Sequence, residues 1–368
     1  MENWKSMLLK DFCIFNANTY GNKDVWIYVN YLDTGNITNN KIEKVQYIDL
    51  NKEKLPSRAR RKISYNSIIY STVRPNQLHY GIIKNIPDNF LVSTGFIVID
   101  VDEKIADADF IYYWLSQSSM ADKLQAIAEQ STSTYPSIKL SDLAELEIYL
   151  PPLWIQKNIS GILSIIDKKI TNNDKINRNL SEQLKAIFLK MFPTITDNGS
   201  NTLEEIISFS NGKKRPDTEG KVPVYGGNGI LSYTDKSNAE NCVIIGRVGA
   251  YCGSLYLSVE PCWISDNAIK AKAKNSNSQM FIYYLLQELA LSNRHIGTSQ
   301  PLLTQGILNA IHFNCPSEED VISFCKKADD IQKLIDMNTI ENKRLSELRD
   351  TLLPKLMSGE LDVSDLYI

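Results

Sequence analysis

Basic side chains crowd one stretch in the first half of the sequence. Between Lys52 and Arg74 the chain carries seven lysines and arginines and a single acid, although its formal net charge is −3. Lysine and arginine contact the phosphates of DNA, and arginine also donates paired hydrogen bonds to guanine. This local positive charge predicts a contact with nucleic acid. The candidates here are Arg58, Arg60, Arg61, Lys62 and Arg74.

A second set of candidates lies in the second half of the chain. Three consecutive basic residues begin at Lys213, and Arg247 stands in a glycine-rich stretch. The phrase YGGNG at Tyr225 to Gly229 carries little side chain, so its backbone is expected to approach DNA closely. For each single residue, solvated surface or an ordinary turn remains the alternative. The candidates here are Lys213, Lys214, Arg215, Tyr225, Gly227, Asn228 and Arg247.

One pattern matches catalytic chemistry. Pro87-Asp88, followed by Asp102-Glu103-Lys104, has the two acids and lysine that surround a metal ion in one class of nuclease. The pattern is short, and Asp88 lies in the turn-like NIPDN. An autonomous metal-dependent DNA endonuclease using Asp88, Asp102 and Lys104 is therefore the alternative to a DNA-binding chain without catalytic residues.

Other catalytic and metal-binding motifs are missing from the sequence. It has neither a P-loop nor the Asn/Asp-Pro-Pro-aromatic motif of a methyltransferase. The six cysteines lack the close pairing of zinc ligands, and the three histidines are scattered. We therefore expect buried free thiols, no metal site and no cofactor. With no apolar run near the roughly 20 residues of a membrane span, we also expect a cytoplasmic protein without membrane contact.

The elements that must position these residues occur twice. The phrase FIYYWL at Phe110 to Leu115 returns as FIYYLL at Phe281 to Leu286. Each copy precedes a Ser/Thr-rich turn ending in proline, a short apolar segment ending in proline, and a long helical pattern. The same offset of 165 residues relates Pro136 to Pro301 and Leu180 to Leu345. These landmarks predict a tandem duplication. Expected strands include residues 24–29, 67–73, 96–101 and 241–249, and each Tyr-Tyr phrase begins a helix, the first over residues 110–130.

Both copies end in a long helical pattern. Apolar residues at three- and four-residue steps predict helices over about 155–192 and 318–357, the first about 57 Å long. Central asparagines weaken the first helix, so it needs tertiary support. We expect an antiparallel helix pair; the alternative is that each helix packs on its own domain. The stripes expected to meet are Ile159, Ile162, Ile166 and Ile170 with Val321, Phe324, Ile331 and Leu334.

Several phrases resemble one protein family. The stretch that opens LPPLWIQKN at Leu150 resembles the central conserved region of type I restriction–modification specificity subunits, although Ile155 replaces the acid usual before the glutamine. Other phrases resemble the target-recognition domains of that family: YSTVRPN (70–76), VSTGFIVID (92–100), VPVYGGNGI (222–230), IIGRVGAYCGSLYL (244–257) and WISDNAI (263–269).

The resemblance implies an α+β fold. Two similar target-recognition domains, each a mixed sheet plus helices, would be joined by two long helices packed as an antiparallel coiled coil with pseudo-two-fold symmetry. The implied segments are recognition domains at 1–150 and 194–315 and conserved helices at 151–193 and 316–368. The implied function is to read a bipartite double-stranded DNA target, one half-site per domain. Such a subunit holds methyltransferase subunits, two being expected, and restriction/translocase subunits, and is not itself catalytic. No code translates these residues into a target sequence.

Overall fold

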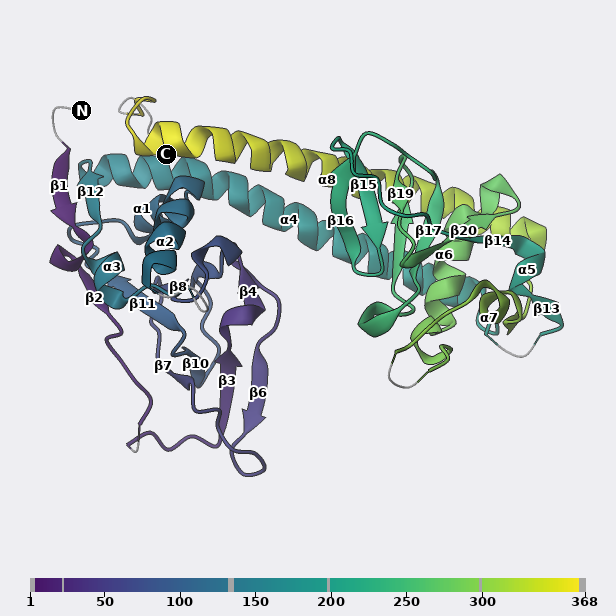
Figure 1. Ribbon diagram of the computed structural model, residues 1–368, viewed down its shortest axis with the longest axis horizontal. Coiled ribbons are helices and arrows are strands. Elements are labelled where there is room, and N and C mark those ends of the chain that lie inside the picture. The colour runs from purple at the N-terminus through teal and green to yellow at the C-terminus, as the bar shows by residue number, and fades with distance from the viewer. Residues whose placement is uncertain (1–3, 22, 132–135, 197–198, 298–299, 364–368) are drawn as a thin grey trace. The chain divides into compact units, whose positions relative to one another are not determined.

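The computed structural model describes residues 4–21, 23–131, 136–196, 199–297 and 300–363. The chain divides into two compact units (Figure 1). Unit 1 contains Met1–Thr171 and Asn342–Ile368, and unit 2 contains Asn172–Glu341. Two long helices, α4 (Leu153–Met191) and α8 (Glu318–Met357), each contribute one part to each unit. In the described ranges, no helix combines the length and the apolar character needed to cross a membrane.

The globular part of unit 1 contains two four-stranded sheets and a short strand pair. The first sheet is antiparallel, and its central strands are rich in β-branched residues and largely buried. Its order is β2 (Cys13–Phe15), β11 (Phe96–Val101), β8 (Ile68–Ser71) and β9 (Tyr80–Ile82). In the second sheet β3 runs parallel to β10, and the order is β6 (Gln46–Asp49), β3 (Tyr28–Leu32), β10 (Phe90–Ser93) and β7 (Ala59–Arg61). The short pair is β1 (Lys5–Leu8) with β12 (Glu147–Leu150).

Unit 2 repeats this topology with different residues. Its antiparallel sheet has the order β14 (Ile207–Asn211), β20 (Ala268–Ala273), β17 (Cys242–Gly246) and β18 (Leu255–Ser258). Its second sheet again contains one parallel pair, in the order β16 (Gly229–Thr234), β15 (Val222–Gly226) and β19 (Trp263–Ile264). The short pair is β13 (Asn201–Thr202) with β21 (His312–Phe313).

The duplication is therefore present in the strand order as well as in the sequence. The helix α1 (Ala108–Leu115) corresponds to α6 (Gln279–Glu288), and α3 (Leu140–Ala144) to α7 (Gln305–Asn309). Unit 1 adds β7, the hairpin of β4 (Ile37–Thr38) with β5 (Lys41–Ile42), and α2 (Ser118–Ser131), which have no counterpart in the described part of unit 2. The shared strands form a frame, and the additions distinguish the two units.

The two long helices run antiparallel, which confirms the first of the two packing alternatives. In unit 1 the beginning of α4 packs against the end of α8, as Ile159 and Leu356 share one core. In unit 2 the end of α4 packs against the beginning of α8, as Leu184 and Phe324 share another. The predicted meeting of the Ile159–Ile170 stripe with the Val321–Leu334 stripe is wrong, because antiparallel helices bring opposite ends together.

Polar groups occupy the centre of both helices. Asn173 is 1% exposed and donates to Glu341 Oε2 at 2.7 Å, whereas the apolar Ile176 is 47% exposed. The amide of Asn177 donates to the Ile335 carbonyl at 3.4 Å in unit 2. In unit 1 the corresponding amide of Asn342 donates to the Ile170 carbonyl at 3.5 Å. These bonds provide the tertiary support that the weak central helix needs.

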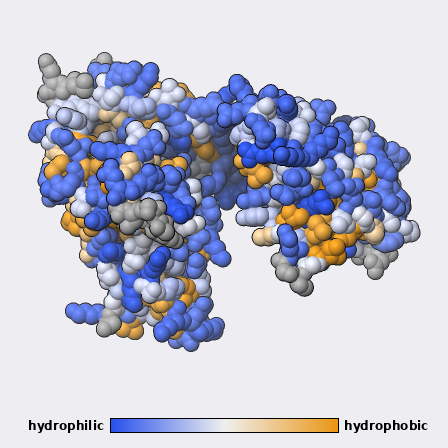
Figure 2. Space-filling view, viewed as in Figure 1, coloured by the Kyte–Doolittle hydropathy of each residue, from blue (hydrophilic) through white to orange (hydrophobic). Residues whose placement is uncertain are grey.

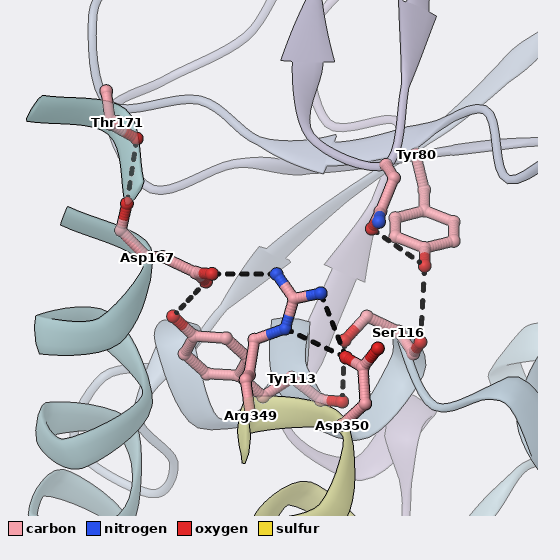
Figure 3. Close-up of polar contacts among 8 residues, drawn as sticks. Tyr80, Tyr113, Ser116, Asp167, Thr171, Arg349 and Asp350 are labelled. Carbon is pink, nitrogen blue, oxygen red and sulfur yellow. Dashed lines mark hydrogen bonds and ion pairs between the residues drawn. The ribbon is translucent and has the colours of Figure 1, made fainter. Parts of the chain in front are cut away.

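The junction between the globular domain and the helices of unit 1 contains a polar cluster (Figure 3) beside its apolar core. Tyr113 of α1 donates to Asp167 Oδ2 at 2.7 Å, and Arg349 of α8 donates to Asp167 Oδ1 at 2.8 Å. The same guanidinium group binds Asp350 through Nη2 at 2.9 Å. Burial lowers the pKa of Arg349, but hydrogen bonds and charge interactions with Asp167 and Asp350 outweigh this effect. The pKa of Arg349 is therefore raised overall. A cavity of about 530 Å³ adjoins this cluster and is also lined by Tyr80.

Four local predictions need correction. The helix expected over residues 110–130 is two helices, because Ser116 ends α1 with hydrogen bonds back to the preceding turn. The strand expected from Asp24 begins only at Tyr28. On α8, Leu334 and Leu348 are about half exposed, at 50% and 48%. All six cysteines are free thiols, but Cys315 is exposed rather than buried. Of the two Ser/Thr-rich turns, residues 132–135 and 298–299 lie outside the described residues.

Candidate nucleic-acid interface

The basic segment of unit 1 lies at the edge of the second sheet, in β7 and the extended segment that pairs with its outer side, together called the basic ribbon. Ala59 is fully buried and fixes β7 in the sheet, where β7 pairs with β10. On its other side β7 meets an extended segment: Tyr20 N donates to the Arg60 carbonyl at 2.8 Å, and Lys62 N donates to the Asn18 carbonyl at 3.1 Å. Because β7 has no counterpart among the described strands of unit 2, these arginines are specific to the unit 1 surface.

The four basic side chains of this segment differ in their surroundings. Arg58 is exposed, and Arg60 is half-buried. Arg61 is half-buried, and its Nε atom is enclosed without a hydrogen-bond partner. Lys62 forms an ion pair with Asp24 at 2.5 Å, and that hydrogen bond lowers the pKa of the Asp24 carboxyl group. Arg58 and Arg60 therefore remain the best placed to contact a phosphate or a base, whereas the charge of Lys62 is already balanced.

A turn between β10 and β11 links the basic segments of unit 1. Thr94 N donates to the Arg58 carbonyl at 2.8 Å. Thr72 N donates to the Gly95 carbonyl at 2.8 Å on the other side of the turn. Two residues after Thr72, the exposed Arg74 has a left-handed backbone (φ 48°) and donates its N–H to the Pro136 carbonyl at 3.0 Å. The fold thus brings the Arg58 and Arg74 segments to one turn, Ser93–Gly95.

The corresponding turn of unit 2, Ser265–Asn267, connects β19 with β20 and gathers the second set of candidates. Lys213 N donates to the Ile264 carbonyl at 3.0 Å. Ser265 N donates to the Tyr225 carbonyl at 2.9 Å, and Arg247 N donates to the Asn267 carbonyl at 3.0 Å. By strand register, Arg247 occupies the place of Thr72 in unit 1. Sequence reasoning missed the exposed turn residues Thr94, Asp266 and Asn267, although VSTGF and WISDN contain them.

The basic run of unit 2 lies beside this turn. Its three side chains are exposed, and the Lys213 carbonyl accepts a hydrogen bond from Trp263 Nε1 at 3.3 Å. A surface hollow of about 850 Å³ lies next to the run. The residues that line it include Lys214, Arg215, Ser232, Tyr233 and Asp266. Lys214 and Arg215 therefore extend the turn into an open surface of mixed charge, which also carries the acidic residues Asp217, Glu219 and Asp266.

Two glycines near the predicted DNA-contacting stretches are closely packed within the protein. A Cβ atom on Gly226 would lie 2.5 Å from a Leu231 methyl carbon, and one on Gly246 would lie 2.2 Å from the Tyr251 carbonyl oxygen. The Gly227 carbonyl accepts a hydrogen bond from Ser254 Oγ at 2.5 Å. Gly226 and Gly246 thus allow the protein's own chain segments to approach closely, whereas a Cβ atom on Gly227 would meet its nearest neighbours only at 3.6 Å, so the approach of the Gly227 backbone to DNA stays a prediction.

Three other candidates of unit 2 have distinct surroundings. Asn228 is exposed at the tip of the β15–β16 hairpin. Tyr225 is half-buried 6.2 Å from the Tyr256 ring, and burial raises the pKa of Tyr225. The Nε atom of Arg247 is enclosed without a hydrogen-bond partner, as in Arg61. Asn228 is therefore the residue of the glycine phrase whose side chain can reach a ligand.

The residues of the endonuclease alternative have ordinary structural contacts. Asp88 is exposed, and its carbonyl accepts a hydrogen bond from Asn30 Nδ2 at 2.8 Å. Asp102 Oδ1 accepts a hydrogen bond from the backbone of Lys104 at 3.0 Å. In the part of the chain that the structure describes, no group of three or more His, Cys, Asp or Glu residues is placed to hold a metal ion. These contacts give the alternative no support.

Comparison with known proteins identifies the family. The model of the type I restriction modification DNA specificity domain matches residues 1–182 and 197–350, and the chain belongs to this family. The HindI specificity subunit of Haemophilus influenzae, a type I restriction enzyme subunit, is 25% identical, with 98% of this chain and 100% of the relative covered. The MjaIX specificity subunit of Methanocaldococcus jannaschii is 24% identical, with 70% of each chain covered.

A solved structure agrees with the fold. The crystal structure of the type I restriction–modification S subunit from M. genitalium has a TM-score of 0.57 at 20% identity and covers 96% of each chain. The chain is a specificity subunit of a type I restriction–modification system, the subunit that recognises DNA and does not catalyse the reaction.

Proposed function

We propose that each unit reads one half of a bipartite double-stranded DNA target. One observation carries the proposal: in both units the candidate DNA-binding residues surround the same turn of a shared frame. That turn is Ser93–Gly95 in unit 1 and Ser265–Asn267 in unit 2. The residues around the two turns differ, which is what two unlike half-sites require.

The proposed contacts divide into two kinds. Exposed or half-buried basic side chains contact phosphates and fix the position of each unit on the duplex. They are Arg58 and Arg60 in unit 1 and Lys213, Lys214 and Arg215 in unit 2. Polar side chains at the tips, such as Thr94, Asn228 and Asn267, are placed to contact base edges, where Asn pairs with adenine.

Partner subunits are part of the proposal. The curated relatives are named as specificity subunits of type I restriction enzymes, which supports assembly with methyltransferase and restriction subunits. In unit 1 the beginning of α4 packs against the end of α8, and in unit 2 the end of α4 packs against the beginning of α8. The chain therefore offers two related sets of helix surfaces, one for each of two methyltransferase subunits. The work of this complex on genomic DNA would take place in the cytoplasm.

Domain exchange tests the proposal. We take residues 1–150 and 194–315 as the two exchangeable recognition domains. Replacing residues 1–150 with the equivalent segment of another family member should change one half of the methylated motif and leave the other half intact. Replacing residues 194–315 is the matched control and should change only the other half. Methylation sequencing of cells that carry each chimaera is the measurement, and a chimaera that changes both halves would contradict the proposal.

A further inference from the structure

Two apolar side chains stand out on the surface of unit 1. Val25 is 92% exposed and Ile27 is 65% exposed, and both precede β3. Single exposed apolar residues are common on proteins, but here two flank a residue that is anchored in the interior. Trp26 packs on the core formed by β3, β6, β7 and β10, with its ring 4.8 Å from Tyr20.

The loop that carries them is held in place. Gly21 N donates to Asp24 Oδ2 at 2.8 Å, and Asp24 N donates to the Gly21 carbonyl at 3.0 Å. Lys62, which follows β7, pairs with Asp24, and its Nζ atom lies 5.4 Å from the centre of the Trp26 ring. Val25 and Ile27 are therefore exposed next to residues, Asp24 and Trp26, that are themselves held by contacts with the rest of unit 1.

The loop continues directly from the basic ribbon. The residues just before it pair with β7, through the Thr19–Arg61 bridge and the bond from Tyr20 N to the Arg60 carbonyl. The end of unit 1 beyond β7 and β10 has hydrophobic residues among hydrophilic ones (Figure 2). Strands at the edge of a sheet can contact bases in the major groove of B-DNA, where the thymine methyl group is the apolar feature of the base edges. Positive charge beside apolar tips matches this groove, which phosphates border on both sides.

We propose that Val25 and Ile27 are base-contacting residues that pack on thymine methyl groups in the major groove of the half-site read by unit 1. The inference rests on the proposed function, since it requires unit 1 to bind DNA. It adds residues 25–27, which carry neither positive charge nor paired hydrogen-bonding groups, to the recognition surface. It also predicts that this half-site contains an A·T pair.

The first experiment replaces the two side chains. The variant with Val25→Ser and Ile27→Ser, assembled with its modification subunits, should bind target DNA about tenfold more weakly and unrelated DNA as before, because each lost methylene contact contributes about 0.8 kcal/mol. Ile14→Ser is the matched control, because Ile14 in β2 is 64% exposed and lies outside the ribbon. A double variant that fails to assemble with the methyltransferase while Ile14→Ser assembles would assign the loop to a protein partner and overturn the inference.

The second experiment removes the DNA methyl groups one at a time. Replacing a contacted thymine by deoxyuridine should weaken binding of the natural chain about fourfold and leave binding of the Val25→Ser, Ile27→Ser variant unchanged. Thymines in the other half-site serve as the control and should be insensitive to the variant. If wild-type binding ignores every thymine methyl in the unit 1 half-site, or if that half-site has no A·T pair, the inference fails. If the natural chain still binds its target DNA in that case, only this inference fails and the proposed function is not affected.

Discussion

The two units attach their globular domains to the helices through apolar cores that differ in what is added to them. In unit 1, Ile159 and Leu356 pack in the core, and the polar cluster of Tyr113, Asp167 and Arg349 is added beside it (Figure 3). Under the duplication Tyr284 replaces Tyr113, Gln332 replaces Asp167 and Leu184 replaces Arg349. Unit 2 packs aromatic rings at this junction in tilted and edge-to-face arrangements. They are Phe188, Phe192, Phe281, Tyr284 and Phe324, all at most 4% exposed.

The difference distinguishes contacts that stabilise a junction from contacts that fix the orientation of the domain on the helices. Aromatic rings bury large apolar areas and stabilise a junction strongly, but they tolerate small rotations. A guanidinium–carboxylate pair stabilises less after desolvation, yet its fixed geometry specifies one arrangement. After duplication the shared frame was kept, while the contacts at each junction became different. The turns proposed to contact DNA likewise lie at corresponding places in the two units and carry different residues.

The largest expected effect is on the aromatic junction. Phe188→Ala should lower the free energy of unfolding of unit 2 by about 3–5 kcal/mol, because Phe188 is fully buried and its ring centre lies 5.3 Å from that of Phe324. Hydrogen exchange measured separately over residues 203–313 and 28–101 would report it. Leu353→Ala, at the corresponding position in unit 1, is the control and should increase exchange in unit 1 alone. Loss of protection in unit 1 from Phe188→Ala would contradict the independence of the two junctions.

A smaller effect is expected at the polar junction. Asp167→Asn or Arg349→Gln should each destabilise unit 1 by about 1–3 kcal/mol, since the remaining partner stays largely buried without its counter-charge. The side chains are 28% and 21% exposed, so solvent screening is limited. The double variant should cost less than the sum of the two single changes, as in any coupled pair. Strict additivity in chemical denaturation would show that the pair contributes no coupling.

The smallest effect concerns charge on the ribbon. Arg58→Gln should weaken binding to all DNA sequences and reduce the slope of log K against log salt by about one. Replacing both Asp24 by Asn and Lys62 by Gln removes the 2.5 Å ion pair and leaves the net charge unchanged, so the slope should stay the same. Salt titrations of both variants test this contrast. An equal change of slope in the two would mean that Lys62 is as available to phosphates as Arg58.

The sequence predicted the repeated parts well because their signals are local. Helical period and flanking prolines placed the first long helix at 155–192, and α4 spans Leu153–Met191. The period does not encode the partner, so the meeting of the stripes was predicted wrongly. Ile176 has the right spacing for the buried face, yet Asn173 takes that place because Glu341 binds its amide.

For the candidate site, the sequence could predict which types of residue take part but not how each side chain is placed. Arg58 and Lys62 look equivalent in the basic run, and they differ because Asp24, 38 residues away from Lys62, neutralises one of them. The glycines around Gly226 read as flexible backbone, whereas a Leu231 side chain fills the space that a Cβ would need. The turns Ser93–Gly95 and Ser265–Asn267 became visible as a shared place only through strand register, which links segments far apart in the chain.

The central claim is that corresponding turns of the two units read separate half-sites. Hydroxyl-radical footprinting of the complete complex on its target DNA tests it most directly, at saturating protein concentration. The variant with Arg58→Gln and Arg60→Gln should lose protection at one half-site only. The variant with Lys214→Gln and Arg215→Gln should lose it only at the other. Loss of protection at the same half-site in both variants, or equal loss across the whole footprint in each, would contradict the account.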